Sequence, residues 1–200
     1  MMPSLLLATH NTGKIAELRA LLAPMICVPQ QELNIPEIEE TGLTFVENAL
    51  LKARHASQWT QGPALADDSG LMVRALQGRP GIHSARYAGP TANASQRIEK
   101  LLTEMAPFPD DERDAYFYCA LVYLRYPNDP APIIATGECH GRITSKALGE
   151  QGFGYDPVFY IPARSATMAQ IPASIKNTLS HRARALLSLK QQLGDEGILP

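Results

Sequence analysis

The most constraining feature of this chain is a short apolar run that leads directly into two adjacent acids. Ala64-Leu65-Ala66 is followed by Asp67-Asp68-Ser69-Gly70, and the chain becomes apolar again at Leu71. This pattern predicts a short buried strand with the two acids in a turn at its carboxyl end. Because neighbouring side chains of an extended segment point to opposite sides, we expect Asp67 and Asp68 to have different roles. Buried carboxylates stay charged only where a cation, a base or N–H donors compensate them.

The Asp68-Ser69-Gly70 segment has three interpretations on its residues alone. It is a turn in which the polar side chains satisfy their own backbone, or a strand end that presents an acid to a metal or a proton. It is also the motif of aspartic proteases, which share one proton between two such loops. That class requires an all-strand chain with a second copy of the motif or a small symmetric dimer, and the sequence indicates neither.

Composition limits the possible partners. The 200 residues suffice for one large domain or two small lobes. With 18 basic and 20 acidic residues the net charge is −2, which predicts no binding of nucleic acid or of an anionic membrane. The three cysteines share no short metal-type spacing, so we expect reduced thiols in a cytoplasmic protein. The first residues lack a basic start and a long apolar run, so we expect neither a signal peptide nor a membrane span.

An expected phosphate site lies near the amino terminus. Leu5–Ala8 is a predicted strand, and Ile15, Leu18 and Leu22 recur at helical spacing until Pro24. A polar turn separates the two elements and consists of Thr9, His10, Asn11, Thr12, Gly13 and Lys14. Free N–H groups at a helix start, together with a lysine, suit an anion. The turn is not a Walker A loop, and capping by its polar side chains is the alternative interpretation.

The following elements alternate in type, which indicates an α/β fold. Thr44-Phe45-Val46-Glu47 has the form of a capping box and predicts a helix to about Trp59, with Asn48 and Lys52 on one face. Three acids, Glu37, Glu39 and Glu40, precede this helix. Further patterns predict helices over 98–105 and 183–193, the latter ended by Gly194, and strands over 115–124, 133–141 and 158–161.

Two late segments favour a nucleotide base as ligand. Between Gly149 and Pro157 three glycines surround Phe153 and Tyr155, and glycine allows close backbone approach while an aromatic face can stack on a base. His181 and Arg182 lie in the first turn of the last predicted helix, where cations oppose the helix dipole, so an anion or a polar base edge is expected there. With carboxylates for Mg²⁺ and a phosphate turn, the set points to a nucleotide polyphosphate.

The sequence resembles the Ham1-type inosine triphosphate pyrophosphatases, which include the bacterial dITP/XTP pyrophosphatases. The resemblance covers essentially the whole chain in order and is highly specific. The matching stretches are Ala8–Lys14, Glu39–Gly42, Glu47–Ala49, Lys52-Ala53, Ala66–Leu71, Pro80–Ile82, Ser84–Gly89, Gly152–Pro157 and Ser180–Arg182.

The resemblance implies a fold, a reaction and an assembly. It implies a single nucleoside triphosphate pyrophosphatase domain over residues 1–200, with an elongated α/β fold of two lobes around a mixed, twisted sheet and the nucleotide in the cleft between them. It implies hydrolysis of ITP, dITP and XTP to the nucleoside monophosphate and pyrophosphate, which cleanses the nucleotide pool. The implied enzyme is a cytoplasmic homodimer that uses Mg²⁺.

The resemblance also implies roles for individual residues. Glu40 and Asp68 would hold Mg²⁺, and Asp68 would be the general base, although Asp67 or Glu40 could take one of these roles. The implied substrate-binding residues are Thr9, His10, Asn11, Thr12, Gly13, Lys14, Lys52, Ser69, Phe153, Gly154, Tyr155, Asp156, Lys176, His181 and Arg182. One departure is Ala173-Ser174-Ile175 before Lys176, where the family usually has acids.

Two other functions are alternatives to this one. A Maf-like nucleotide pyrophosphatase would act on other bases, and the Phe153–Asp156 and Ser180–Arg182 stretches argue against it. A nucleotide-binding sensor without catalysis would lack the metal-binding acids, which are present here as Glu40, Asp67 and Asp68.

Overall fold

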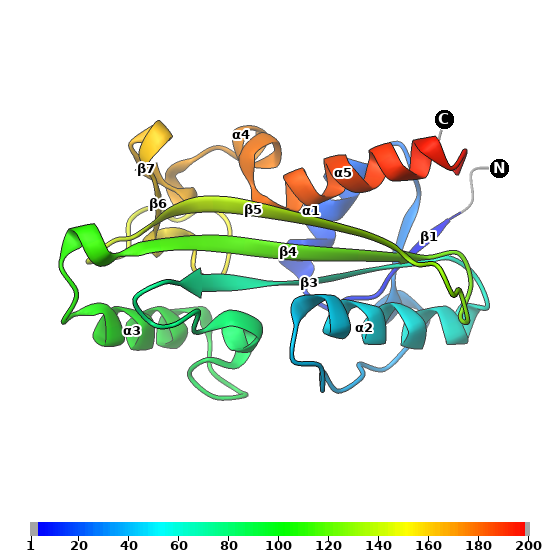
Figure 1. The fold of residues 1–200 in the computed structure, drawn as a ribbon, viewed down its shortest axis with the longest axis horizontal. Coiled ribbons are helices and arrows are strands. Elements are labelled where there is room, and N and C mark those ends of the chain that lie inside the picture. Colours follow the sequence, from blue (N-terminus) through cyan, green and yellow to red (C-terminus); the bar gives the residue numbers. More distant parts are fainter. Residues whose placement is uncertain (1–3, 199–200) are drawn as a thin grey trace. The chain divides into compact units, whose positions relative to one another are not determined.

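The computed structural model describes residues 4–198 and has a mixed α/β fold (Figure 1). The described chain forms two compact units. Unit 1 comprises residues up to Asp68, residues 119–137 and the chain from Arg182 onward, and unit 2 comprises residues 69–118 and 138–181. Each unit is therefore built from segments that are distant in sequence.

In the described part of the chain, a mixed sheet of seven strands is the framework of both units, and three of the strands contribute residues to each unit. The order is β2-β1-β3-β4-β5-β6-β7. Strand β1 is parallel to β2 and β3, whereas β6 is antiparallel to β5 and β7. The strands are β1 Leu5–Leu7, β2 Cys27–Pro29, β3 Ala64–Val73, β4 Asp114–Leu124, β5 Ile133–Ile143, β6 Phe159–Ile161 and β7 Ala166–Thr167. The predicted α/β class with a mixed sheet is confirmed.

Within residues 4–198, five α-helices accompany the sheet, and their starts follow from local sequence. The helices are α1 Thr12–Leu22, α2 Phe45–Thr60, α3 Ala94–Met105, α4 Ala173–Leu179 and α5 His181–Asp195. Helix α2 begins with the predicted capping box, in which the Thr44 hydroxyl accepts from the Glu47 N–H at 3.2 Å and the Glu47 carboxylate accepts from the Thr44 N–H at 2.8 Å. No helix of the described residues is long and apolar enough to cross a membrane.

Unit 1 has its own hydrophobic core. Leu7 of β1, Leu65 of β3 and Leu121 of β4 pack with Leu18 of α1 and Leu189 of α5, and all five are essentially buried. Helices α1 and α5 lie on one side of these strands and α2 on the other (Figure 1). The small residues of α2 allow close approach to the sheet, because Ala49, Ala53 and Ala56 are fully buried on it.

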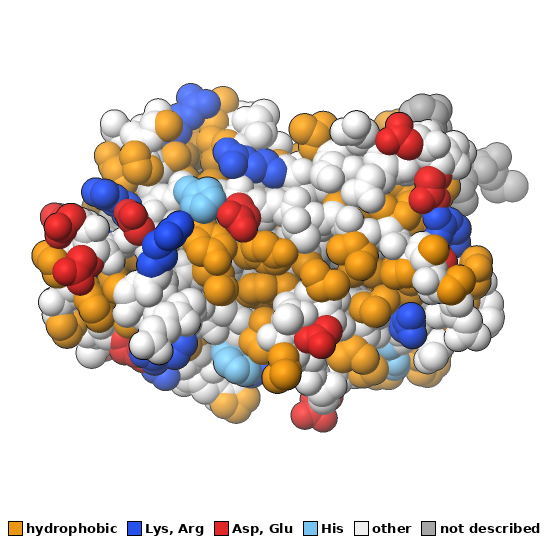
Figure 2. Space-filling model, in the orientation of Figure 1, with side chains coloured by type: hydrophobic (Ala, Val, Ile, Leu, Met, Phe, Trp, Pro, Cys, Tyr) orange, Lys and Arg blue, Asp and Glu red, His pale blue; other side chains and the backbone are white. Residues whose placement is uncertain are grey.

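Unit 2 has a second, aromatic core. The rings of Phe117 and Phe159 lie 4.5 Å apart, and Leu101 and Met105 of α3 pack into the same cluster. The other side of β4 in this unit is less covered, since Tyr116 and Tyr118 are only half-buried. Figure 2 shows hydrophobic side chains among charged ones over the strands on this view of the molecule.

Two expectations about local structure are wrong, and one helix was not predicted. The acids Asp67 and Asp68 do not lie in a turn at a strand end but within β3, which runs without interruption to Val73. The strand continues because cationic side chains compensate both carboxylates, so a turn exposed to water is not needed. Gly194 does not end α5, which extends to Asp195. The short helix α4, which carries Lys176, was not predicted.

Candidate active site

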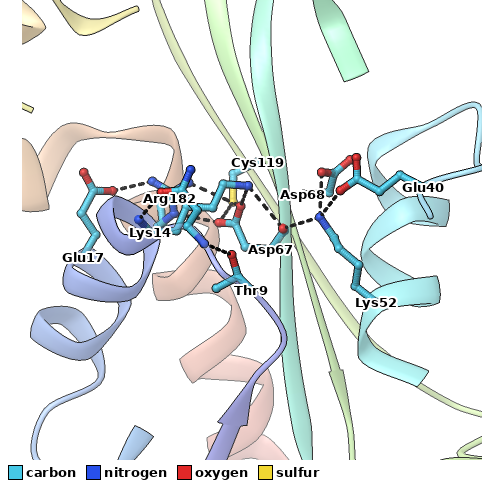
Figure 3. A network of polar contacts seen from close by, with 10 residues as sticks. Thr9, Lys14, Glu17, Glu40, Lys52, Asp67, Asp68, Cys119 and Arg182 are labelled. Carbon is cyan, nitrogen blue, oxygen red and sulfur yellow. Dashed lines mark hydrogen bonds and ion pairs between the residues drawn. The ribbon is translucent and has the colours of Figure 1, made fainter. Parts of the chain in front are cut away.

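Strand β3 separates its two acids onto opposite sides, as the alternation of side chains predicts (Figure 3). Asp67 points towards Lys14 and Arg182, and Asp68 points towards Lys52 and Glu40 (Figure 3). All these residues belong to unit 1. The predicted placement of the two side chains on opposite sides of the strand is confirmed, and their different roles stay a prediction.

The carboxylate of Asp67 is completely buried and is contacted by donors of Lys14, Arg182 and Cys119. The Lys14 ammonium lies 2.6 Å from Oδ1, the Arg182 Nε donates to Oδ2 at 2.7 Å, and the Cys119 thiol donates to Oδ2 at 3.2 Å. Burial acts to raise the pKa of Asp67, but the positive charges of Arg182 and Lys14 outweigh it and hold the pKa well below its usual range. Asp67 is therefore a permanent buried anion at neutral pH.

The side chains around Asp67 have further partners that balance their charge. The Arg182 guanidinium also pairs with Glu17 of α1, which lies one turn after Lys14. Burial raises the pKa of the Cys119 thiol well above its ordinary value, and the Asp67 charge raises it further, so the thiol stays protonated and donates. The four charges of Lys14, Asp67, Arg182 and Glu17 sum to zero. Their arrangement fixes the start of α5 and the first turns of α1 around one carboxylate.

The second acid, Asp68, belongs to a cluster with a net negative charge. The Lys52 ammonium of α2 lies 2.8 Å from Glu40 Oε1 and 2.9 Å from Asp68 Oδ1. The remaining oxygen, Asp68 Oδ2, is buried and accepts no hydrogen bond from any group of the described protein. Burial raises the pKa of Asp68 although the charges of Lys52 and Lys14 oppose this. A buried carboxylate oxygen without a donor is costly, so this oxygen is prepared for a ligand.

The donor set around Asp68 fits a divalent cation. Two carboxylates and one ammonium leave one negative charge in a largely buried site. Mg²⁺ in proteins is usually held by one or two carboxylates, with water and substrate phosphates as its other ligands. The described residues contain no group of three acidic, histidine or cysteine side chains placed to hold a metal by themselves. The carboxylates of Glu40 and Asp68, with Asp68 Oδ2 still available, are the number of protein ligands expected for a Mg²⁺ ion whose other ligands are water and phosphate oxygens.

The predicted phosphate turn forms the start of α1. Asn11 is the N-cap residue, and its side chain accepts from the Lys14 N–H at 3.0 Å. The Thr9 hydroxyl accepts from the Asn11 N–H at 3.2 Å, which holds the turn. Thr12 and Gly13 are the first helical residues, whose N–H groups have no partner within a helix. The ring of His10 instead hydrogen-bonds to the Ile35 carbonyl at 3.1 Å.

Of the predicted base-binding residues of unit 2, the structure brings Lys176, Asp156 and Phe153 together. Lys176 Nζ lies 2.6 Å from Asp156 Oδ2 and 4.7 Å from the ring centre of Phe153. Tyr155 is buried and its hydroxyl donates to the Ser84 carbonyl at 2.9 Å, so it braces the loop. The His181 ring stacks on Phe117 at 4.8 Å. Ser69 is half-buried on β3, and Gly154 has space around its Cα.

Arg182 does not share the surroundings of His181, although the two residues are adjacent. It belongs to unit 1 and is bound by Asp67 and Glu17, as described above. Three residues of this network, Glu17, Asp67 and Cys119, were not among the predicted substrate-binding residues. The spacing of Lys14 and Glu17 on one helix face was the available signal for Glu17. The contact of Cys119 with Asp67 joins residues 52 positions apart and had no local signal.

Gly152 is required by the geometry of the Asp156 carboxylate, and this gives a test. Its φ is +77°, and an added Cβ would lie 2.0 Å from Asp156 Oδ2. Gly154 also has a positive φ, +64°, but nothing lies within 4 Å of its added Cβ. Both alanine variants should lose about 1–2 kcal/mol from backbone strain, and Gly152→Ala should lose a further ~1–3 kcal/mol from the clash. Urea unfolding of both variants measures this difference, and equal losses would contradict it.

The chain is an α/β protein with a mixed sheet, and two adjacent aspartates of the central strand β3 form the centre of its candidate active site. It belongs to the Ham1 family, whose family model matches residues 5–192. A relative from Legionella pneumophila (strain Paris), named dITP/XTP pyrophosphatase, is 56% identical over 97% of this chain and 100% of its own. One of the same name from Xanthomonas axonopodis pv. citri (strain 306) is 54% identical over 96% of this chain and 98% of its own. The solved structure of a HAM1 protein from Coxiella burnetii matches with a TM-score of 0.89 and 45% identity, over 97% of this chain and 100% of that one.

Proposed function

We propose that this protein is a pyrophosphohydrolase of deaminated purine nucleoside triphosphates. ITP, dITP and XTP would be cleaved between the α and β phosphates to the nucleoside monophosphate and pyrophosphate. Membership of the Ham1 family and the names of its relatives, dITP/XTP pyrophosphatase, support this function. The structural observation that carries it is the buried, unpaired oxygen of Asp68 in a cluster of net negative charge.

Glu40 and Asp68 are the residues proposed to hold Mg²⁺. The cation would neutralise phosphate charge and polarise the phosphorus–oxygen bonds. The unpaired Asp68 Oδ2 supports this assignment, because a cation would satisfy an oxygen that the described protein leaves without a donor.

Asp68 is also proposed as the general base for the attacking water. A raised pKa makes a carboxylate a stronger base, and burial raises the pKa of Asp68. The water oxygen forms a bond to the α-phosphorus while the bond from this phosphorus to the bridging oxygen breaks. The proton of the water passes to Asp68, and the electron pair leaves with pyrophosphate.

The polar turn before α1 is proposed to bind the triphosphate. Its helix start offers N–H groups, and Lys14 adds a full positive charge. Its assigned residues are Thr9 through Lys14, with Lys52 beside them. Charge that grows on the leaving pyrophosphate is stabilised by donors fixed in advance, and Asp67 holds the Lys14 ammonium in place at 2.6 Å.

The residues of unit 2 are proposed to read the base. Ser69, Phe153 through Asp156, Lys176 and His181 are assigned to the nucleoside, together with Arg182 of unit 1. Hypoxanthine and xanthine carry a 6-carbonyl acceptor where adenine carries an amino donor. Donors placed around that oxygen would remain unpaired when adenine is bound, and this lowers kcat/KM by up to roughly 10⁴-fold in favourable cases.

The family resemblance also favours a cytoplasmic homodimer. The free cysteines Cys27, Cys119 and Cys139 are compatible with a reducing compartment.

A substrate panel tests the proposed reaction. ITP, dITP, XTP, ATP and GTP are incubated with the protein and Mg²⁺, and pyrophosphate and orthophosphate are measured separately. We expect pyrophosphate from the three deaminated nucleotides, at a kcat/KM about 10²- to 10⁴-fold above that for ATP. Orthophosphate as the first product would contradict the bond cleaved. Equal rates on ATP would contradict the base reading, and binding of ITP without any product would identify a sensor.

A further inference from the structure

The ammonium of Lys52 is held by three oxygens at nearly equal distances. Its Nζ lies 2.8 Å from Glu40 Oε1, 2.9 Å from Asp68 Oδ1 and 2.9 Å from the Asp67 carbonyl oxygen. A lysine ammonium has three N–H donors, so these contacts use all of them. Figure 3 shows the ammonium at the end of an extended side chain, pointing from α2 towards β3.

The surroundings of this ammonium resemble those of a bound cation. Lys52 and Asp68 have side chains only 15% and 7% exposed, and that of Glu40 is 25% exposed. Two carboxylates in such a place require a counter-cation, because buried charges are stable only when paired. In this structure the chain supplies that cation from its own helix.

We propose that Lys52 is a resident counter-cation whose ammonium occupies the place of a divalent cation between Glu40 and Asp68. It thereby keeps the affinity for free metal low until a metal arrives with a triphosphate. This inference rests on the proposed function and makes it more specific, since it assigns Lys52 a role in the order of binding. This role precedes the substrate contact that the family resemblance implies for this residue, because it describes the lysine before the nucleotide binds.

The chemistry of the two cations explains why nucleotide is needed for the exchange. A divalent cation next to the Lys52 ammonium would be repelled strongly at a separation of a few ångströms in a poorly solvated site. Free metal must therefore displace the ammonium from the oxygens of both Glu40 and Asp68. A triphosphate brings anionic oxygens that can accept the three N–H donors of the lysine. Metal and triphosphate together thus satisfy both the carboxylates and the displaced ammonium.

The second observation that supports the exchange is the unused oxygen of Asp68. Oδ1 is occupied by the ammonium, whereas Oδ2 is buried and has no donor among the residues that the structure describes. The carboxylate pair therefore has more capacity for positive charge than one lysine supplies. Removing the ammonium should leave a pair of carboxylates that binds free metal more tightly.

Binding of Mn²⁺ to the nucleotide-free protein tests this role without measuring activity. The electron paramagnetic resonance signal of free Mn²⁺ is titrated with the wild type and with Lys52→Met, which keeps an unbranched side chain one atom shorter and removes its charge. We expect the variant to bind one Mn²⁺ at least about tenfold more tightly, since it removes the competing charge. Adding a non-hydrolysable ITP analogue should tighten binding in the wild type much more than in Lys52→Met.

Two control variants separate this role from a general effect of charge. Lys52→Arg keeps the cation and should bind Mn²⁺ as weakly as the wild type. Lys190→Met removes one positive charge from unit 1 at a residue whose ammonium donates to the Leu21 carbonyl, and should also leave Mn²⁺ binding unchanged. If Lys52→Met does not fold, Lys52→Gln removes the charge but keeps an N–H donor, and the same tightening is expected.

The possible outcomes distinguish this inference from the proposed function. Equal affinity for Mn²⁺ in the wild type and both neutral variants, with the site otherwise functional, overturns only the role of Lys52. Weaker binding in the neutral variants overturns it as well, because the lysine would then assist the metal. Failure of all variants to bind Mn²⁺, even with the nucleotide analogue, removes the metal site and the inference together.

Discussion

Replacing Asp68 by asparagine should lower kcat for pyrophosphate release from ITP by about 10²- to 10⁴-fold, the usual contribution of a general base. The amide keeps the volume of the side chain and one oxygen, but it cannot take the proton of the attacking water. Binding of ITP should be largely intact, because the residues assigned to the triphosphate and to the base are unchanged. Single-turnover kinetics with ITP and Mg²⁺ give the rate, and isothermal titration with the same nucleotide gives the affinity.

Glu39→Gln is the matched control for this variant. It removes one carboxylate at an exposed position immediately before Glu40, so the turnover of ITP should stay within about twofold of the wild type, as for surface substitutions in general. Normal turnover by Asp68→Asn would exclude Asp68 as the base. A loss of ITP affinity as large as the loss in rate would instead show that Asp68 acts mainly in binding.

Several parts of this site could be predicted because their signals are local. The alternation of an extended segment places Asp67 and Asp68 on opposite sides. Helical spacing places Asn48 and Lys52 on one face of α2, and Lys52 indeed reaches the acids of β3 from there. The capping pattern at Thr44 gave the start of α2. Each of these inferences depends on residues within a few positions of one another.

The uninterrupted strand β3 was not predicted because its cause is not local. Two adjacent acids followed by serine and glycine are typical of a turn. They remain within a strand here because Lys14 and Arg182 compensate Asp67, and Lys52 compensates Asp68. The Arg182 contact joins residues 115 positions apart. No pattern within residues 64–71 could therefore predict the ion pair between Asp67 and Arg182.

The first turn of α5 shows how a correct physical argument can lead to an incomplete picture. Cations there oppose the helix dipole, which predicted a nearby anion. The structure supplies anions from the chain itself, since Arg182 is bound by Asp67 and Glu17. The same argument cannot distinguish a ligand from a distant carboxylate. Contact of Arg182 with a nucleotide base therefore stays a prediction.

The buried network around Asp67 should be a large contributor to stability. Asp67→Asn leaves the buried Arg182 and the Lys14 ammonium without their shared carboxylate, and we expect the free energy of unfolding to fall by about 3–5 kcal/mol at pH 7. Urea unfolding followed by circular dichroism measures the loss. Glu32→Gln is the matched control, because Glu32 also pairs with an arginine, Arg19, at 2.8 Å. Both side chains of that pair are about half exposed, so its loss should stay below about 1 kcal/mol.

The pH dependence of this loss identifies its electrostatic origin. The pKa of Asp67 in the folded protein is well below that of the unfolded chain, so its ionised form stabilises the fold at every pH above the unfolded value near 3.8. The difference between wild type and Asp67→Asn should therefore be constant from pH 7 to about pH 5. Below about pH 4 it should shrink as the pH falls towards the folded pKa, because the unfolded chain then binds the proton first. A difference that stays constant down to pH 2 would mean that packing, rather than the charge of Asp67, accounts for the loss.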